Sequence, residues 1–171
     1  MSILFITIVP SIIIFCYFYF ADKFKEPKQT IAIIFALGIL ICFPAGVVNS
    51  FIIDNFQKDT NFSERLYSSF LTAAWVEELL KFFVLYFIVL RRSEFNEPMD
   101  GIVYGVTVSL GFATYENYDY VFYWAKEWDI DPNQMAIWRS YSAIPLHGLC
   151  GVVMGFYFGL YSFTAKYKYL I

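Results

Sequence analysis

Five long apolar stretches dominate the sequence and restrict the folds open to it. Each reaches or approaches the roughly 20 residues that an α-helix needs to cross the hydrocarbon core of a bilayer. Hydrophobic residues make up 59% of the 171-residue chain and charged residues 16%, whereas a soluble domain has roughly 45–50% and 25%. We therefore predict an all-α fold, a polytopic transmembrane helix bundle in the cell membrane, with helices over residues 3–20, 30–53, 66–90, 99–124 and 135–163.

Of the twelve lysines and arginines, Lys81 and Arg139 lie within helices, and the other ten are divided unevenly between the two ends of the helices. Most lie beside the helix ends on one side: Lys23, Lys25, Lys28, Arg91, Arg92, Lys166 and Lys168. Fewer lie on the other side: Lys58, Arg65 and Lys126. Because short cytoplasmic segments collect basic residues, we expect the N-terminus outside and the C-terminus inside. No soluble domain or long linker interrupts the pattern, so residues 1–171 are expected to form a single membrane-embedded domain.

Charge and cysteine placement argue against two classes of protein. The formal net charge is -3 and no basic stripe occurs, so a nucleic-acid partner is not expected. Cys16, Cys42 and Cys150 each lie within an apolar stretch, and no CxxC pair is present. A disulfide framework or a zinc ribbon is therefore not expected either.

The third apolar stretch contains three charged residues, Glu77, Glu78 and Lys81. A charge at the centre of a membrane costs about 2.5–3.5 kcal/mol on insertion scales, so such residues usually serve a purpose. Lys81 follows the two glutamates by four and three residues, and both spacings place the pair on one helix face. We expect Lys81 to neutralise one carboxylate and to leave the other available.

Polar residues on the next two helices fall at a similar depth. Glu116 and Asn117 lie on the fourth helix, and His147, which is the single histidine, follows Pro145 on the fifth. At 1.5 Å per residue, Glu77, Glu116 and His147 lie about 16, 12 and 18 Å below the outer helix ends. Pro145 should kink the fifth helix, and kinked membrane helices usually line a cavity or pack on protein. The agreement in depth predicts that three helices bring these groups into one site.

Structural roles remain open for the same residues. Glu77, Glu78 and Lys81 are also compatible with an ion pair that joins helices, and Glu116 with Asn117 are compatible with hydrogen bonds between helices. His147 is compatible with a satisfied structural histidine. Arg139, near the outer end of the fifth helix, is expected to be an interfacial anchor or an ion-pair partner.

Small residues recur every four positions on two of the helices. Gly101, Gly105 and Ser109 lie on the fourth, and Gly151, Gly155 and Gly159 continue the spacing of His147 on the fifth. Such stripes let helices approach closely. We assign them to packing, and they also permit a homodimer.

Several short motifs occur in a fixed order along the chain. They are Asp22 with Glu26-Pro27, Glu77-Glu78-x-x-Lys81, Asp100-Gly101-Ile102-Val103-Tyr104-Gly105, Gly111-Phe112-Ala113-x-x-Glu116-Asn117-x-x-Tyr120, His147-Gly148 and Met154-Gly155-Phe156-Tyr157. In this order the chain resembles the PrsW-type intramembrane proteases, relatives of the CAAX-prenyl-protease and bacteriocin-processing superfamily.

The resemblance implies an endopeptidase that cuts a membrane-anchored protein near the outer membrane face. Its implied substrate is a single-span protein of the anti-sigma-factor kind. Glu77 or Glu78 would activate water, Glu116 and His147 would complete the site, and Lys81, Asn117 and Arg139 would support it. A zinc ion held by Glu77, Glu116 and His147 is compatible with these ligand types, and a glutamate mechanism without metal stays open.

The chain departs from the family pattern in one respect. Family members usually carry a late motif of the type His-Gly-x-Tyr-Asp on further helices, whereas this sequence has one histidine and extends to Ile171. We therefore expect the family's C-terminal helices to be missing. This leaves two alternatives: a truncated, inactive pseudoprotease or scaffold that binds a single-span partner, and part of a transporter, in which buried Glu, Lys and His also occur.

Overall fold

The computed structural model describes residues 2–56 and 75–168, and this part of the chain is helical without strands. The α-helices are α1 (Ile3–Ala21), α2 (Lys28–Leu40), α3 (Cys42–Phe56), α5 (Glu77–Phe87), α6 (Pro98–Asp119), α7 (Ala125–Glu127), α8 (Pro132–Tyr141) and α9 (Ala143–Lys168). A 3-10 turn, η2 (Val89–Arg91), and a π-helical turn, η3 (Tyr120–Trp124), join some of them. The predicted all-α fold is confirmed.

The predicted helices match this arrangement with two differences. The first matches α1, and the fourth runs through α6 and η3. The second and fifth are each divided in two, and the third is described only from Trp75, so residues 66–74 lie outside the described part. In the part that the structure describes, three stretches are long and apolar enough to cross a membrane: Ile3–Ala21, Lys28–Asn55 and Pro132–Thr164. These stretches support a multi-pass membrane protein.

Both divided helices break at the same distance before a proline. Helix α2 ends at Leu40, four residues before Pro44, and α8 ends at Tyr141, four residues before Pro145. A proline cannot donate a backbone hydrogen bond to the carbonyl four residues earlier, and its ring clashes with that carbonyl. The kink predicted at Pro145 therefore takes the form of a break at Ser142, between α8 and α9.

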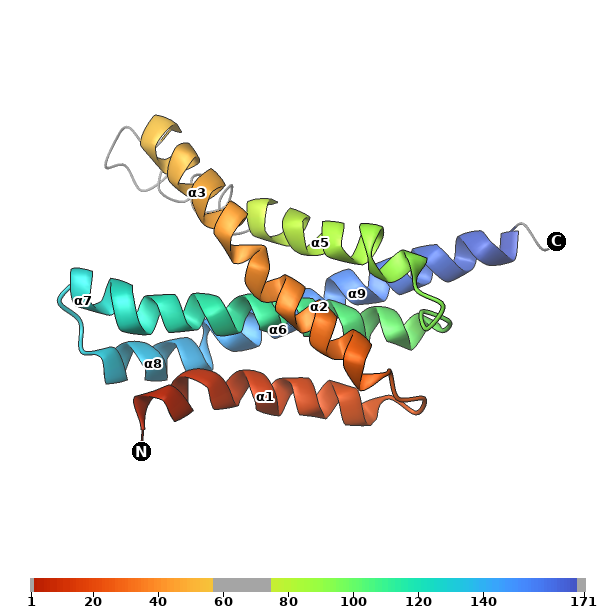
Figure 1. Ribbon diagram of the computed structural model, residues 1–171, viewed down its shortest axis with the longest axis horizontal. Helices are drawn as coiled ribbons and strands as arrows, with labels where there is room; N and C mark the ends of the chain where they lie inside the picture. The colour runs from red at the N-terminus through yellow and green to blue at the C-terminus, as the bar shows by residue number, and fades with distance from the viewer. Residues whose placement is uncertain (1, 57–74, 169–171) are drawn as a thin grey trace.

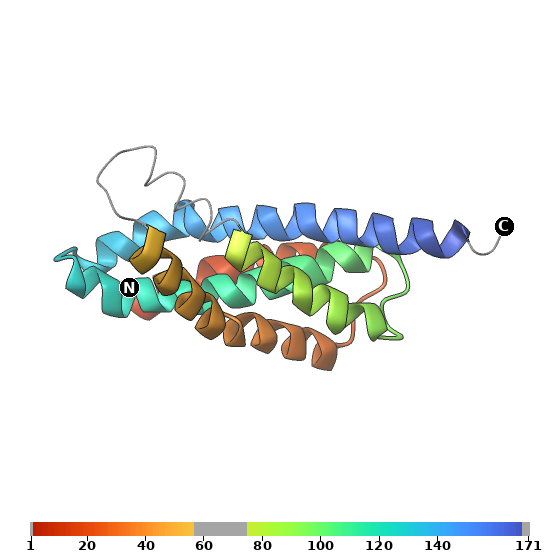
Figure 2. The same ribbon diagram turned by 90° about the horizontal axis from the view of Figure 1, so that it is seen from above.

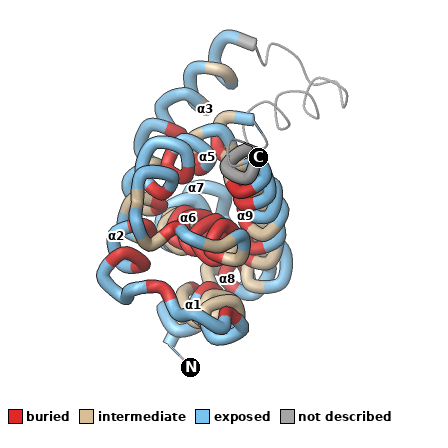
Figure 3. Tube along the Cα trace, turned by 90° about the vertical axis from the view of Figure 1, so that its right-hand side faces the viewer, coloured by how far each residue is buried: buried red, intermediate tan, exposed pale blue. Residues whose placement is uncertain are grey.

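Helix α6 lies at the centre of the bundle, with α9, α2 and α1 packed around it (Figures 1 and 2). It is buried along most of its length, while the outer helices expose long faces (Figure 3). Helix α1 buries the small polar residues Thr7 and Ser11 and exposes large apolar ones such as Ile13 and Tyr17. An apolar outer surface of this kind suits lipid rather than water as the surrounding solvent. Because α6 is surrounded by protein, it can be less apolar than the helices that face lipid.

Glycines bring α6 and α9 into backbone contact. A Cβ atom at Gly105 would lie 2.4 Å from the carbonyl oxygen of Gly151, and one at Gly155 would lie 2.1 Å from that of Gly101. A Cβ at Gly151 would also come within 2.9 Å of the hydroxyl of Ser109. The two small-residue stripes therefore face each other inside one chain, as the packing assignment predicts. A homodimer stays a prediction.

The two ends of the bundle differ in charge. The α1–α2 turn, the segment between α5 and α6, and the C-terminal end of α9 lie at one end (Figure 1). Lys23, Lys25, Lys28, Arg91 and Arg92 belong to this end, as the predicted division of basic residues requires. Which end faces the cytoplasm stays a prediction.

The α6–α9 contact predicts opposite effects for two alanine substitutions. Gly105→Ala should lower the free energy of unfolding by about 1–3 kcal/mol, because its Cβ forces two backbones apart. Gly46→Ala is the matched control, because no described atom lies within 4 Å of its Cβ position on α3. It should be neutral or stabilise by about 0.5–1 kcal/mol, since alanine has the higher helix propensity. Thermal unfolding in detergent measures both, and equal effects would contradict the close contact.

Candidate active site

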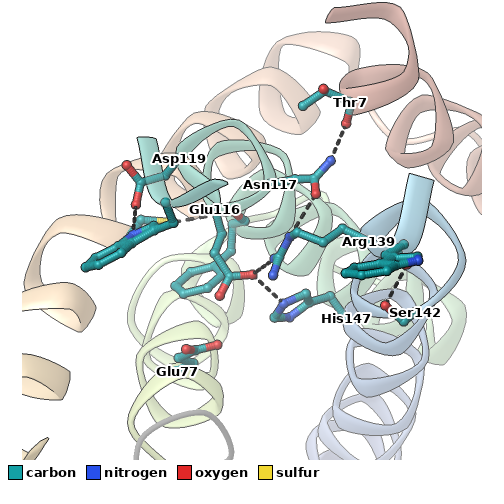
Figure 4. A network of polar contacts seen from close by, with 12 residues as sticks. Thr7, Glu77, Glu116, Asn117, Asp119, Arg139, Ser142 and His147 are labelled. Carbon is teal, nitrogen blue, oxygen red and sulfur yellow. Dashed lines mark hydrogen bonds and ion pairs between the residues drawn. The ribbon is translucent and has the colours of Figure 1, made fainter. Parts of the chain in front are cut away.

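Three helices bring Glu77, Glu116 and His147 together. Glu77 lies in the first turn of α5, Glu116 near the end of α6, and His147 near the start of α9. One ligand-type atom of each lies within 4.8 Å of the others, and the three side chains point toward one another (Figure 4). The convergence expected from their depths in the sequence is therefore present.

The carboxylate of Glu116 contacts the guanidinium of Arg139 and the imidazole of His147. Its Oε2 atom lies 2.5 Å from Nη2 of Arg139, on α8, and 3.0 Å from Nε2 of His147, on α9. Both contacts use the same oxygen (Figure 4). A charge-assisted pair of this kind holds the carboxylate and the imidazole in fixed orientations.

Asn117 holds Arg139 in place. Nε of Arg139 donates to Oδ1 of Asn117 at 2.9 Å, and Nδ2 of Asn117 donates to the carbonyl oxygen of Thr7 on α1 at 2.7 Å. The guanidinium also lies 3.9 Å from the ring centroid of Tyr120. Arg139 is thus the ion-pair partner that the sequence allowed. Asn117 acts on Glu116 through Arg139 rather than by direct contact.

Lys81 lies between Glu78 and His147 and is fully buried. Its Nζ atom is 2.6 Å from Oε1 of Glu78 and 3.0 Å from Nδ1 of His147, and it lies 4.3 Å from the ring centroid of Phe112. An ammonium group can only donate hydrogen bonds, so Nδ1 of His147 is the acceptor. The proton of a neutral imidazole is then on Nε2, where it is donated to Glu116.

Of the three glutamates around His147, Glu77 is the one without an ion-pair partner among the described residues. It is 6% exposed, and its Oε1 atom accepts a long hydrogen bond of 3.4 Å from Nδ2 of Asn49. Lys81 forms its ion pair with Glu78, so the carboxylate of Glu77 is not neutralised by this lysine. A buried carboxylate with so little compensation is costly in an apolar bundle, and such groups concentrate at functional sites.

Comparison with known proteins assigns the chain to a family. The sequence model of the PrsW family intramembrane metalloproteases matches residues 26–170. The chain belongs to the PrsW family.

Curated relatives agree with this assignment. Protease PrsW of Geobacillus kaustophilus is 37% identical over 160 residues, which cover 93% of this chain and 66% of the relative. Protease PrsW of Bacillus subtilis is 36% identical, with 92% and 68% covered, and that of Clostridioides difficile is 29% identical, with 94% and 66% covered. The chain thus spans about two thirds of the length of these relatives. No solved structure matches it.

A metal is implied by the family description, and the residues present fit one in kind and spacing. Glu77 and Glu116 offer carboxylate oxygens, and His147 offers an imidazole nitrogen. Catalytic zinc sites commonly use three such protein ligands and keep a position for water. A ligating Nε2 must be unprotonated. In that state the proton moves to Nδ1, and Lys81 would pair with Glu78 alone.

Glu78, which contacts the cluster through Lys81, also lines a groove between α5 and α9. The groove has a volume of about 630 Å³ and is lined by Trp75, Glu78, Leu79, Phe82, Leu149, Cys150, Val153 and Met154. The Glu78 side chain is 27% exposed. The structure therefore gives the two neighbouring glutamates different surroundings: Glu77 belongs to the buried cluster, and Glu78 joins that cluster, through Lys81, to a mostly apolar groove.

Sequence reasoning missed Asn49, Thr7 and Phe112. Asn49 is an amide within an apolar stretch, which is a signal for a contact between membrane helices. Thr7 contributes its backbone carbonyl, and Phe112 its ring face. Neither role leaves a recognisable pattern in a sequence.

The buried Lys81–Glu78 pair predicts strong coupling. Lys81→Met should lower the free energy of unfolding by roughly 2 kcal/mol or more, because it leaves Glu78 without a cation. The double variant Lys81→Met, Glu78→Gln should recover part of this loss, with a coupling energy of about 0.5–3 kcal/mol. Lys126→Met, at an exposed lysine on α7, is the control and should change little. Additive effects in a double-mutant cycle of thermal unfolding would rule out the pair.

Proposed function

We propose that this chain is a membrane-embedded endopeptidase that cuts a membrane-anchored protein near the outer membrane face, with single-span, anti-sigma-factor-like proteins as its substrate class. The observation that carries the proposal is the position of Glu77. It is a buried carboxylate without an ion-pair partner in the described part of the chain, and it lies within 4.8 Å of Glu116 and His147. In a member of the PrsW family, this arrangement supports hydrolysis.

In the proposed reaction, Glu77 takes a proton from a water molecule as the water oxygen attacks the carbonyl carbon of the scissile peptide. As charge develops on the carbonyl oxygen, the Nε2–H of His147 turns from Glu116, which keeps its ion pair with Arg139, and donates to that oxyanion instead. Glu77 then returns its proton to the leaving amine as the C–N bond breaks. One water is consumed, and a carboxylic acid and an amine are released.

The remaining charged groups position this machinery. Arg139 and Glu116 hold the imidazole, and Lys81 fixes its tautomer through Nδ1. If Glu77, Glu116 and His147 held zinc, the metal would supply Lewis-acid polarisation of the carbonyl. Glu78 would then be the glutamate left to act as the base.

The groove between α5 and α9 is the proposed route of the substrate. Its lining is mostly apolar, and Glu78 is the carboxylate among the lining residues. A transmembrane helix of the substrate has the matching apolar surface, and it would bring its scissile bond to Glu78 and so to Lys81 and His147. The groove thus connects the lipid-facing surface with the polar cluster.

The first test is cleavage of a single-span reporter in liposomes. Glu77→Gln and His147→Ala should each lower the cleavage rate by about 100-fold or more, because each removes a group that moves or stabilises charge. Glu78→Gln should lower it to a similar extent, because it removes the partner of Lys81, which fixes the tautomer of His147. Glu127→Gln, at an exposed glutamate on α7, removes the same charge and should cleave like the parent.

Each other outcome has a definite meaning. Reporter binding without any product, with or without zinc, would establish the pseudoprotease or scaffold instead. Ion flux driven by a pH gradient, without product, would establish a transporter. Full activity in all three site variants would overturn the assignment of the site.

The second test uses the native Cys150 in the groove. In a Cys16→Ala, Cys42→Ala background, Cys150 should form a disulfide with a cysteine placed in the transmembrane segment of the reporter. As a matched control, Ile13→Cys with Cys150→Ala moves the thiol to the exposed face of α1 and should cross-link far less. Equal cross-linking on gel electrophoresis would show that the groove is not the docking site.

A further inference from the structure

A second cluster of acidic residues lies at the other end of α6. Asp22 follows α1, Glu26 lies in the α1–α2 turn, and Asp100 is in the first turn of α6. One carboxylate oxygen of each lies within 4.8 Å of the others. Along α6, sixteen residues or about 24 Å separate Asp100 from Glu116. This cluster is therefore separate from the candidate active site.

The three carboxylates are buried and carry no counter-charge among the described residues. Asp22, Glu26 and Asp100 are 2%, 4% and 1% exposed. None forms an ion pair within the described part of the chain. Lys25 is adjacent in sequence, but its ammonium donates to the backbone carbonyl oxygens of Phe20 and Asp22. Three uncompensated carboxylates in one buried place are too costly to persist without a proton or a cation.

Backbone donors hold one oxygen of each aspartate and leave the second oxygen without a partner. Oδ1 of Asp22 accepts from the amide of Phe24 at 3.1 Å, and Oδ2 of Asp100 accepts from the amides of Asn96 and Glu97 at 2.8 and 2.9 Å. In the described part of the structure, Oδ2 of Asp22 and Oδ1 of Asp100 are buried without any hydrogen-bond partner. Buried oxygens are almost always paired, so two orphans in one cluster indicate a missing ligand.

We propose that Asp22, Glu26 and Asp100 bind a hard divalent cation, Ca²⁺ or Mg²⁺. The donors are carboxylate oxygens without sulfur or nitrogen, which is the set that these ions prefer. The hydroxyl of Tyr104 donates to Oε2 of Glu26 and fixes that carboxylate at the edge of the cluster. The bound ion ties the α1–α2 turn to the start of α6.

The proposal gives a role to motif residues that the hydrolytic reaction does not use. Asp22, Glu26, Asp100 and Tyr104 all lie far from Glu77 and His147 along the bundle. The competing occupant is a proton, because burial raises the pKa of Glu26 to about 7. A cation and a proton make opposite predictions for the neutral analogues of the aspartates.

The test is thermal unfolding of the full chain in detergent, first with EDTA and then with Ca²⁺ or Mg²⁺ added. A cation at about 100 times its Kd should raise the melting temperature by roughly 5 °C or more. Asp22→Asn and Asp100→Asn should each abolish this rise. Glu127→Gln and His147→Ala should keep it, which separates this cation from any zinc at the other site.

Isothermal titration calorimetry measures cation binding directly, so it is the second test where a variant is too unstable for thermal unfolding. The parent should bind one Ca²⁺ or Mg²⁺, and Glu26→Gln should bind it at least tenfold more weakly. Absence of binding to the parent would overturn the proposal. So would a cation-independent rise in melting temperature for Asp22→Asn, because that result means the cluster holds a proton and gains from losing a charge.

Discussion

The cost of burying charge in an apolar bundle governs how this molecule is organised. Three glutamates, a lysine, an arginine and the single histidine lie within helices that otherwise face lipid or one another. They are tolerated because nearly all of them are satisfied by each other: Lys81 by Glu78 and His147, and Arg139 by Glu116 and Asn117. Glu77 is left over, and its weak contact with Asn49 does not offset its burial. The hydrolysis that we propose depends on this carboxylate of Glu77.

Close packing of α6 on α9 sets the distance across which these groups meet. The glycine stripes allow backbone contact along most of the interface. His147 continues the α9 stripe one step above Gly151, and Glu116 lies beyond Ser109 on α6. The long side chains of His147 and Glu116 thus lie beyond the ends of the two stripes of small residues. Their length lets the imidazole and the carboxylate meet at 3.0 Å across the interface.

Much of the fold could be predicted from the sequence because membrane helices must be long and apolar. The ends of α1 follow directly from its apolar run. The breaks after Leu40 and Tyr141 depend on Pro44 and Pro145, and a proline in a sequence predicts a kink without deciding whether the helix ends there. Helix α6, together with η3, matches the fourth apolar stretch, and its central place in the bundle follows from the small residues that let α9 pack closely on it.

The site was predictable in its members and less so in its pairings. Equal depths of Glu77, Glu116 and His147 follow from counting residues along helices, and these groups do converge. Counting cannot decide which glutamate Lys81 contacts, because both spacings suit one helix face. It also cannot show that Asn117 reaches Arg139, since that depends on the rotation of α6 relative to α8. The orphan oxygens of Asp22 and Asp100 depend on loop geometry and have no signature in the sequence.

The break at Ser142 has a mechanical consequence for the site. Arg139 lies on one side of it and His147 on the other, and both hold the same oxygen of Glu116. The Glu116 carboxylate therefore connects α8 to α9 across the break and restrains the angle between them. A ligand that draws this oxygen away would release both contacts, so occupancy of the cluster and the angle between α8 and α9 are linked.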